Sequence, residues 1–553
     1  MTEKDNLVNL ETQGSIQVKN TKDSAFSFPG LPKTVAPSEA YTSSDEHLWD
    51  ELSRIDLLVR AQTILWRQTI AAVKPQRFWG MAHISDKEVD AYLRSSFTPP
   101  YHFATHLKRV LERYWNAAEK MAQKTKIRVK ETSSKIDLRL RQLKDLFKLS
   151  RLELDILLVV LLSELDERYR RLFGYLLDDA SKTQPTVDLV LQILYPVMRQ
   201  FSDAGKDGSI FKIGRSVFNS DGNLSQHYLI QLNNTTQMPE SISLHTLHLN
   251  ERVSGYLLGN DTLDRHLVGV TLFPFAGDPI NRLHGNKAQN NYLLEFARWW
   301  KSLKKNLDRG LVLYLHGQYG SGRLKAALTF CREMESDLLL IDSTRVLDPA
   351  ENWEQFIDLC YREASLRSAA LCWLKCERYL AEDQPQNRWN YLVRRAENAS
   401  IWTFFSGETV WNPTDQFQES FFLNVDFAMP DYEAREEFWQ KHLPPDDRFA
   451  EPEPYRENLA PVLATSFQLT EGQIVDAIAT AERVAILRDI QNQKLKADDL
   501  YAGCRRQSSR RLINLAQRIE PYTQLTFDNL ILPRPNRRQL EELRTRICYQ
   551  CKV

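Results

Sequence analysis

The chain has 553 residues, of which 42% are hydrophobic, and this is enough for about three or four globular domains with packed cores. Lysine plus arginine and aspartate plus glutamate balance at 72 each, which excludes a protein that holds polyanions through its overall charge. The sequence contains no apolar run long enough to span a bilayer and no apolar signal-peptide core in its first residues, so we expect a cytoplasmic protein without membrane contact.

The first part of the chain is polar and then becomes helical. Residues 1–44 include three prolines and little periodicity, which predicts a flexible arm. Apolar residues recur at helical spacing over residues 45–70 and again over residues 103–122. We therefore expect a small helical region over residues 45–135.

Two stretches are locally basic. Residues 108–151 contain fourteen lysines and arginines against five acidic residues, and residues 501–552 contain eleven against four. A basic helical face can contact nucleic acid or an acidic protein, and a solvated helix face is the alternative interpretation. Nucleic acid is therefore one candidate partner, through these stretches.

Helices followed by a β-hairpin are predicted over residues 136–270. The helices cover residues 138–147, 151–163 and 186–199, and strands at 210–213 and 228–232 flank a turn at 220–223. This order describes a winged-helix domain. Its candidate recognition helix, the third one, offers only Gln192 and Arg199 for base contacts, which favours packing or protein binding over base readout.

The same region carries a resemblance to a known family. The run LELDILLVVLLSELDERYRRLFGYLLDD at residues 152–179, QPTV at 184–187 and GYLLGN at 255–260 resemble the winged-helix domain that precedes the ATPase cassettes of a bacterial AAA+ family. Some members of that family are encoded beside phage-tail-like contractile injection systems. The resemblance covers about residues 138–267.

A glycine-rich turn follows a short apolar strand at residues 311–315 and opens a helix. It has the spacing of a phosphate-binding loop, in which backbone N–H groups cradle phosphates, a lysine reaches the terminal ones and a hydroxyl holds Mg²⁺. Arginine takes the place of the lysine and keeps the charge, whereas leucine replaces the hydroxyl and cannot bind Mg²⁺. The expected phosphate-binding residues are Gly317, Gln318, Tyr319, Gly320, Ser321, Gly322, Arg323 and Leu324.

Four further strands are expected at residues 338–343, 369–374, 401–405 and 421–425. The resemblance implies two carboxylates directly after the strand at residues 369–374, but Lys375 and Cys376 occupy those positions. Glu377, one position beyond, is a weak catalytic candidate, and a solvent-facing carboxylate is the alternative. The resemblance likewise makes Ser406 a candidate for the family's first sensor, with an ordinary turn serine as the alternative.

The C-terminal part resembles the same family, with further departures. A lid segment at residues 467–475 has Val475 where the family's second-sensor arginine is expected, and residues 415–419 lack an arginine finger. Residues 521–553 resemble the approach to a second cassette. Cys548 and Cys551 form a single C-x-x-C pair, and with seven scattered cysteines we expect reduced thiols and no metal site.

The resemblance thus implies an α/β P-loop NTPase (AAA+) core with a helical lid, preceded by α-helical and winged-helix (α+β) domains. The core would span residues 285–440, the lid 441–520 and the lead-in to a second cassette 521–553. Because the lysine, the magnesium hydroxyl, the paired carboxylates, the finger and the second sensor are all missing, we expect ATP or ADP to be held without Mg²⁺ and without hydrolysis.

The expected function is that of a non-hydrolysing scaffold or regulatory subunit whose partners are AAA+ subunits, identical or different, with an unidentified client. Two alternatives stay open at this point. One is an active ATPase in which Arg323 replaces the lysine and Glu377 activates water. The other is a nucleic-acid-binding winged-helix protein.

Overall fold

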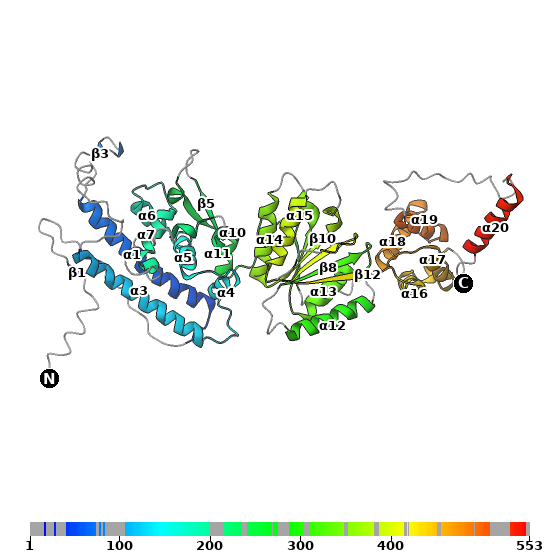
Figure 1. The fold of residues 1–553 in the computed structure, drawn as a ribbon, viewed down its shortest axis with the longest axis horizontal. Helices are drawn as coiled ribbons and strands as arrows, with labels where there is room; N and C mark the ends of the chain where they lie inside the picture. Colours follow the sequence, from blue (N-terminus) through cyan, green and yellow to red (C-terminus); the bar gives the residue numbers. More distant parts are fainter. Residues whose placement is uncertain are drawn as a thin grey trace. The chain divides into compact units, whose positions relative to one another are not determined.

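The computed structural model divides the chain into two compact units, Met1–His266 and Leu267–Val553 (Figure 1). The predicted arm lies outside the described residues, apart from residues 40–44 and two short antiparallel strands, β1 (Ile16–Gln17) and β2 (Ser27–Phe28). The structure describes residues 16–17, 27–28, 40–72, 77–78, 81–82, 105–199, 214–219, 222–234, 241–267, 269–274, 287–303, 310–347, 352–380, 386–413, 417, 420–450, 455–490, 493–508 and 531–548.

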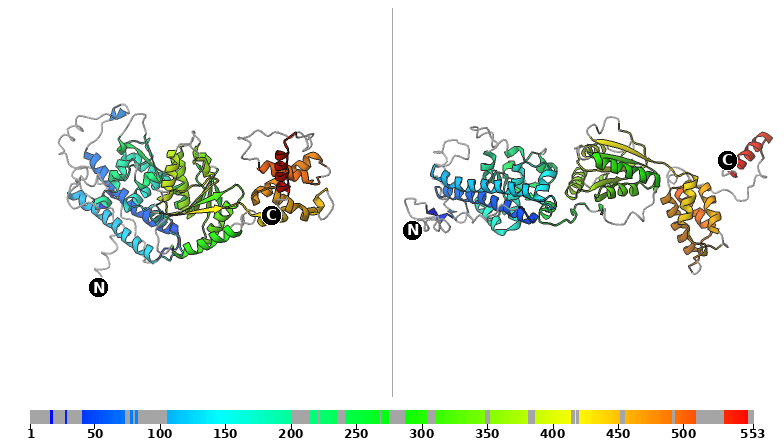
Figure 2. Two further views of the ribbon diagram at one scale, coloured as in Figure 1. Left: turned by 45° about the vertical axis from the view of Figure 1, so that its right-hand side comes forward. Right: turned by 90° about the horizontal axis from the view of Figure 1, so that it is seen from below.

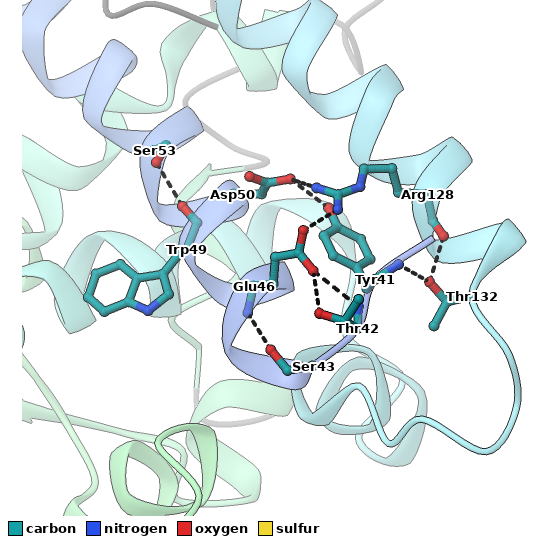
Figure 3. Close-up of polar contacts among 9 residues, drawn as sticks. All are labelled: Tyr41, Thr42, Ser43, Glu46, Trp49, Asp50, Ser53, Arg128 and Thr132. Carbon is teal, nitrogen blue, oxygen red and sulfur yellow. Dashed lines mark hydrogen bonds and ion pairs between the residues drawn. The ribbon is translucent and has the colours of Figure 1, made fainter. Parts of the chain in front are cut away.

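Two long helices, α1 (Ser44–Ala72) and α3 (Thr105–Glu131), confirm the helices predicted in the first unit. The end of α3 is fastened to the start of α1 by Arg128, which donates to Asp50 at 2.6 Å and also pairs with Glu46 (Figure 3). The Arg128 guanidinium lies 4.0 Å over the ring of Tyr41, which adds a cation–π contact. Arg128, one of the residues of the first basic stretch, therefore makes its contacts within the unit.

Helix α5 (Arg151–Leu165) is the buried centre of the first unit, because its apolar residues cover nearly its whole circumference. It begins at a capping box, in which Ser150 Oγ accepts from the Glu153 N–H and the Glu153 carboxylate accepts from the Ser150 N–H. Helix α4 (Arg139–Leu146) precedes it as predicted, and α6 (Glu167–Leu176) follows it.

The predicted helix over residues 186–199 is wrong in one respect, since it is divided into α7 (Val187–Ile193) and α8 (Tyr195–Arg199). Thr186 caps α7 through its side chain. The division has a local cause: Pro196 has no N–H to donate to the carbonyl four residues earlier, so the α-helical ladder cannot pass through it.

The predicted hairpin also needs correction. The strand expected at residues 228–232 is β5 (Ile230–Asn233), and it pairs antiparallel with β6 (Thr246–Leu249). The expected partner strand at residues 210–213 lies outside the described residues. Where the turn was expected, Gly222 instead caps the short helix α10 (Asn223–Gln226), since the Ser225 and Gln226 N–H groups bond to its carbonyl. The helix α11 (Glu251–Leu257) follows the hairpin.

The second unit is built on a sheet with the strand order β12-β8-β11-β10-β9-β7, in which β7 is antiparallel to β9 and all other neighbours are parallel. All five core strands predicted from the sequence are present, and β7 is a sixth strand that was not predicted. The strands are β7 (Thr271–Phe273), β8 (Leu311–Gly317), β9 (Leu338–Asp342), β10 (Ala370–Leu374), β11 (Thr403–Gly407) and β12 (Phe421–Phe427).

Helices cover both faces of this sheet (Figure 1). On one face α12 (Lys287–Leu303) and α13 (Arg323–Glu333) pack together, and their apolar side chains share a core with β8, β10 and β11. The other face carries α14 (Trp353–Arg367) and α15 (Gln386–Glu397). The result is a doubly covered, mostly parallel α/β sheet.

A bundle of four helices follows the sheet, drawn in yellow to orange in Figure 2. Trp439 lies in its apolar core and is fully buried. The bundle consists of α16 (Tyr432–His442), α17 (Tyr455–Ser466), α18 (Glu471–Arg488) and α19 (Ala497–Ser508). Beyond it, nearly all described side chains of α20 (Arg534–Cys548) are exposed. Within the described part of the chain, no helix has both the length and the apolar composition needed to cross a membrane.

Candidate functional site

The glycine-rich turn lies at the carboxyl end of β8, between the strand and α13. Gly320 and Gly322 have φ values of +76° and +99°, a region that side chains with a Cβ rarely enter, so this turn depends on its glycines. The strand β8 lies between β11 and β12. The strands that follow it, β9, β10 and β11, lie on one side of β8, and the last strand, β12, lies on its other side. Such a reversal point in an open α/β sheet is where ligands bind.

The bundle docks directly on this turn. Thr470 Oγ1 donates to the carbonyl of Tyr319 at 2.7 Å, and the N–H of Gly472 donates to the carbonyl of Gly320 at 3.1 Å. A Cβ added to Gly472 would lie 2.6 Å from the Cα of Gly320, so the two backbones touch. Both hydrogen bonds use carbonyl oxygens of the turn and not the N–H groups that would face a phosphate.

Arg323 begins α13 and is partly buried beside two carboxylates. Burial lowers the pKa of its guanidinium, and the charges of Glu408 and Glu377 act in the opposite direction and raise it. The guanidinium stays protonated at any physiological pH. Glu377 itself accepts a hydrogen bond from the backbone N–H of Glu408 at 3.2 Å. The charges of both carboxylates therefore act on Arg323 beside the turn.

Leu324 does not face a ligand through its side chain, because it packs against the apolar core that α12, α13 and the sheet share. Its position therefore offers neither an oxygen nor a nitrogen to a metal ion. The role predicted for this residue in the loop rests on its backbone alone.

A lysine side chain lies at the end of β10, where the family resemblance implies a pair of carboxylates. Lys375 follows the strand in the left-handed conformation, with φ of +61°, and its Nζ lies 2.5 Å from Asp342 Oδ2. The neighbouring Cys376 is fully buried, its thiol donates to the carbonyl of Trp373 at 3.2 Å, and burial raises its pKa. Neither residue can support a magnesium ion.

Ser406 is buried in β11, which extends two positions beyond its predicted end at residue 405. It pairs in register with Leu315 of β8, one strand away from Glu377 and its neighbours. The structure thus brings Ser406, Glu377 and Arg323 to the same end of the sheet, although their roles stay predictions.

Ser321 is one of the expected phosphate-binding residues, and its side chain is buried. It is 9% exposed, and among the described residues no group forms a hydrogen bond with its Oγ. The hydroxyl lies inside the turn, since a Cβ at Gly317 would be 3.0 Å from it. Buried hydroxyls normally have a hydrogen-bond partner, and the Ser321 hydroxyl has none among the described residues.

The candidate recognition helix of the first unit, α7, exposes few side chains that could contact DNA bases. Five of the seven residues in α7 are buried, and Gln192 accepts a hydrogen bond from Gln62 of α1 at 2.9 Å while donating to Asp188 at 2.7 Å. The side chain of Arg199 lies outside the described residues. The polar group available to the predicted helix is therefore used inside the protein.

Comparison with known proteins agrees with the organisation of the first unit. No curated protein matches the chain. A family model described as "Winged helix domain, variant" matches residues 31–271, and the matched range therefore includes α1 and α3 as well as the segment predicted from the sequence. The N-terminal part of this chain is thus similar to variant winged-helix domains, which confirms the winged-helix prediction.

Proposed function

We propose that the second unit is an AAA+-type module that binds the phosphate groups of ATP or ADP without hydrolysing them, and that the protein serves as a scaffold or regulatory subunit for other AAA+ subunits. The observation that carries the proposal is the buried Ser321 hydroxyl without a partner among the described residues, in a glycine turn at the start of α13. Helix N-termini attract anions, and a phosphate oxygen would accept from this hydroxyl.

The arrangement of the sheet supports the phosphate-binding part of the proposal. The turn follows the strand β8, which has neighbours on both sides, and a helix starts directly after it. This strand–turn–helix context is the one that a phosphate-binding loop requires. Ser321, Arg323 and the backbone N–H groups of the turn would hold the phosphates.

The residues around the turn do not fit a bound Mg²⁺, which supports the absence of hydrolysis. Leu324 is packed into the core, and Lys375 places an ammonium group at the end of β10. Phosphoryl transfer depends on a metal that bridges the phosphates and neutralises the developing charge. Arg323 could replace one charge but not the metal, and the negative charges of Glu408 and Glu377 act on it.

A scaffold role needs surfaces that bind proteins, and two parts of the chain support it. The buried α7 favours packing and protein contact over base readout in the first unit. The exposed α20, with Leu543 53% exposed, offers a helical face in the segment that would lead toward a partner cassette.

Replacing Arg323 with alanine should weaken the binding of ADP and ATP by about tenfold to a hundredfold, because one charge-assisted hydrogen bond is lost. Isothermal titration of the full chain measures the change. Arg332→Ala is the matched control, since it removes the same charge from the exposed end of the same helix. Equal binding by Arg323→Ala and the parent protein would contradict the assignment.

A further inference from the structure

The sheet of the second unit ends in two edge strands, β7 and β12, which differ in length. β7 has three residues, whereas β12 has seven, all of them in register with β8. An edge strand offers a row of backbone N–H and C=O groups to another extended chain, and proteins normally keep such edges short or place lysine or proline in them. β12 is long and contains neither proline nor lysine, so its outer edge can pair with a further strand.

The bonds between β12 and β8 show which backbone groups face outward. The N–H of Phe421 donates to the carbonyl of Gly310 at 2.8 Å, so Phe421 bonds toward β8. The bonding direction alternates along a strand, and the backbone groups of Phe422, Asn424 and Asp426 therefore point away from β8. Among the described residues, no group bonds to the backbone of these three on that side. These N–H and C=O groups are the ones that a partner strand would bond.

Exposed aromatic side chains lie beside this edge. Tyr292 and Trp299 of α12 are 50% and 47% exposed, and Phe421 at the start of β12 is 36% exposed. The ring centroid of Phe421 lies 6.1 Å from that of Trp299 and 6.0 Å from that of Phe296. Positions 292, 296 and 299 share one face of α12 by helical spacing. We call these four side chains the aromatic patch, and contiguous exposed apolar surface of this kind marks a protein-binding site.

The opposite face of β12 carries an acidic group. Side chains alternate between the two faces of a strand, so Asp426 lies on the face opposite to Phe421. The Asp426 side chain is 69% exposed, although its Oδ1 lies 2.9 Å from Nδ1 of His316. A strand added along β12 would therefore meet aromatic rings on one face of the sheet and a carboxylate on the other.

This distribution fits a different strand better than a second copy of β12. Antiparallel pairing of two copies centred on Asn424 would place Phe422 of each copy opposite Asp426 of the other. Neither Asp426 would then face a cation. Opposite charges are the favourable cross-strand pair for a carboxylate, so the matching strand carries a basic residue at this position.

We propose that the outer edge of β12 and the aromatic patch together bind an extended segment of a partner protein, which adds a further strand to the sheet. Apolar side chains at every second position of this segment pack on the patch, and a lysine or arginine between them pairs with Asp426. Backbone hydrogen bonds supply the affinity, and the two different faces supply the specificity. The proposal does not require a nucleotide at the glycine turn.

A blocked heptapeptide tests the chemistry, with lysine at every odd position and phenylalanine, valine and phenylalanine between them. The pattern reads the same in both directions, so the peptide can pair in parallel or antiparallel orientation. We expect it to bind the nucleotide-free full chain in isothermal titration. A matched peptide with glutamate in place of every lysine should bind at least about tenfold more weakly, because one cross-strand ion pair becomes a like-charge pair. The lysine peptide N-methylated at every residue should not bind, because it has no N–H to donate.

Variants of β12 and α12 test the location. Asn424→Pro removes an outward N–H and no bond to β8, and it should abolish binding of the lysine peptide. Asn424→Ala also loses the side-chain bond to the carbonyl of Trp411 but keeps the N–H, so it should bind as the parent does. Trp299→Ala should weaken binding about tenfold, and Tyr175→Ala, which removes an exposed ring from the first unit, should not.

Three results would overturn the proposal: no binding of the lysine peptide, undiminished binding of the methylated peptide, or equal binding by Asn424→Pro and Asn424→Ala. The methylated peptide makes the test without any change to the protein, so it decides the matter even where the proline variant does not fold. A concentration-dependent dimer of the full chain that Asn424→Pro abolishes would also overturn it, because the occupant of the edge would then be a second copy.

Discussion

Replacing Asp155 with alanine should lower the free energy of unfolding of the first unit by about 3–5 kcal/mol, which is the usual result of removing one partner from a buried ion pair. Asp155 is fully buried on α5 and pairs with Arg54 on α1. Without it, Arg54 would keep only Glu51, and Arg151 would lose one of its two carboxylates. Hydrogen exchange of the α5 amides measures the loss in the intact chain.

Two further variants distinguish the effect of breaking a buried ion pair on stability from the effect of removing any carboxylate charge. Asp145→Ala removes an exposed carboxylate that lies 3.6 Å from Arg141, and it should change stability by less than about 1 kcal/mol. The double variant Arg54→Met with Asp155→Leu replaces the pair with apolar groups and should recover much of the loss. A similar small effect for Asp155→Ala and Asp145→Ala would contradict the buried network.

Replacing Gly320 with alanine should separate the bundle from the glycine turn and cost about 2–5 kcal/mol. Gly320 has φ of +76°, which costs a residue with a Cβ about 1–2 kcal/mol. The new Cβ would also lie 2.6 Å from Thr470 Oγ1 and 2.9 Å from the Cα of Gly472, and overpacking of this kind costs about 1–3 kcal/mol. Faster hydrogen exchange at the start of α18 is the expected signature.

Gly259 provides the matched control for this substitution. Its φ is +87°, but a Cβ there would have no atom within 4 Å. Gly259→Ala should therefore cost only the backbone term, about 1–2 kcal/mol, and leave α18 unaffected. If both alanine variants gave the same loss and the same exchange at α18, close packing between turn and bundle would be the wrong explanation.

The sequence predicted those elements whose pattern is local. The core strands are short apolar runs between polar turns, α1 has apolar residues at helical spacing, and α5 is an apolar run too long for a typical strand, so each could be found from its own residues. The glycine turn was also found locally, since its φ angles need glycine at fixed positions. Pairing was less predictable, and β5 has β6 as its neighbour because tertiary packing selects among strands that look alike.

The contacts that define the candidate site and the buried network of the first unit join residues far apart in the chain. Gly320 meets Gly472, and Arg54 meets Asp155, at separations that no spacing rule covers. Ser321 occupies a variable position of its motif, so only the burial of its hydroxyl marks it. The energetic effect of a buried charge or hydroxyl depends on the groups that surround it. A single sequence does not show which groups these are.

We expect this protein to bind a nucleotide without magnesium and without turnover. Titration of the nucleotide-free full chain with ATP and ADP, with and without Mg²⁺, followed by phosphate release from the same samples, tests it most directly. We expect the same affinity in both conditions and no phosphate release above that of a blank. Binding that requires Mg²⁺ and is accompanied by steady phosphate release would contradict the account and identify an active ATPase.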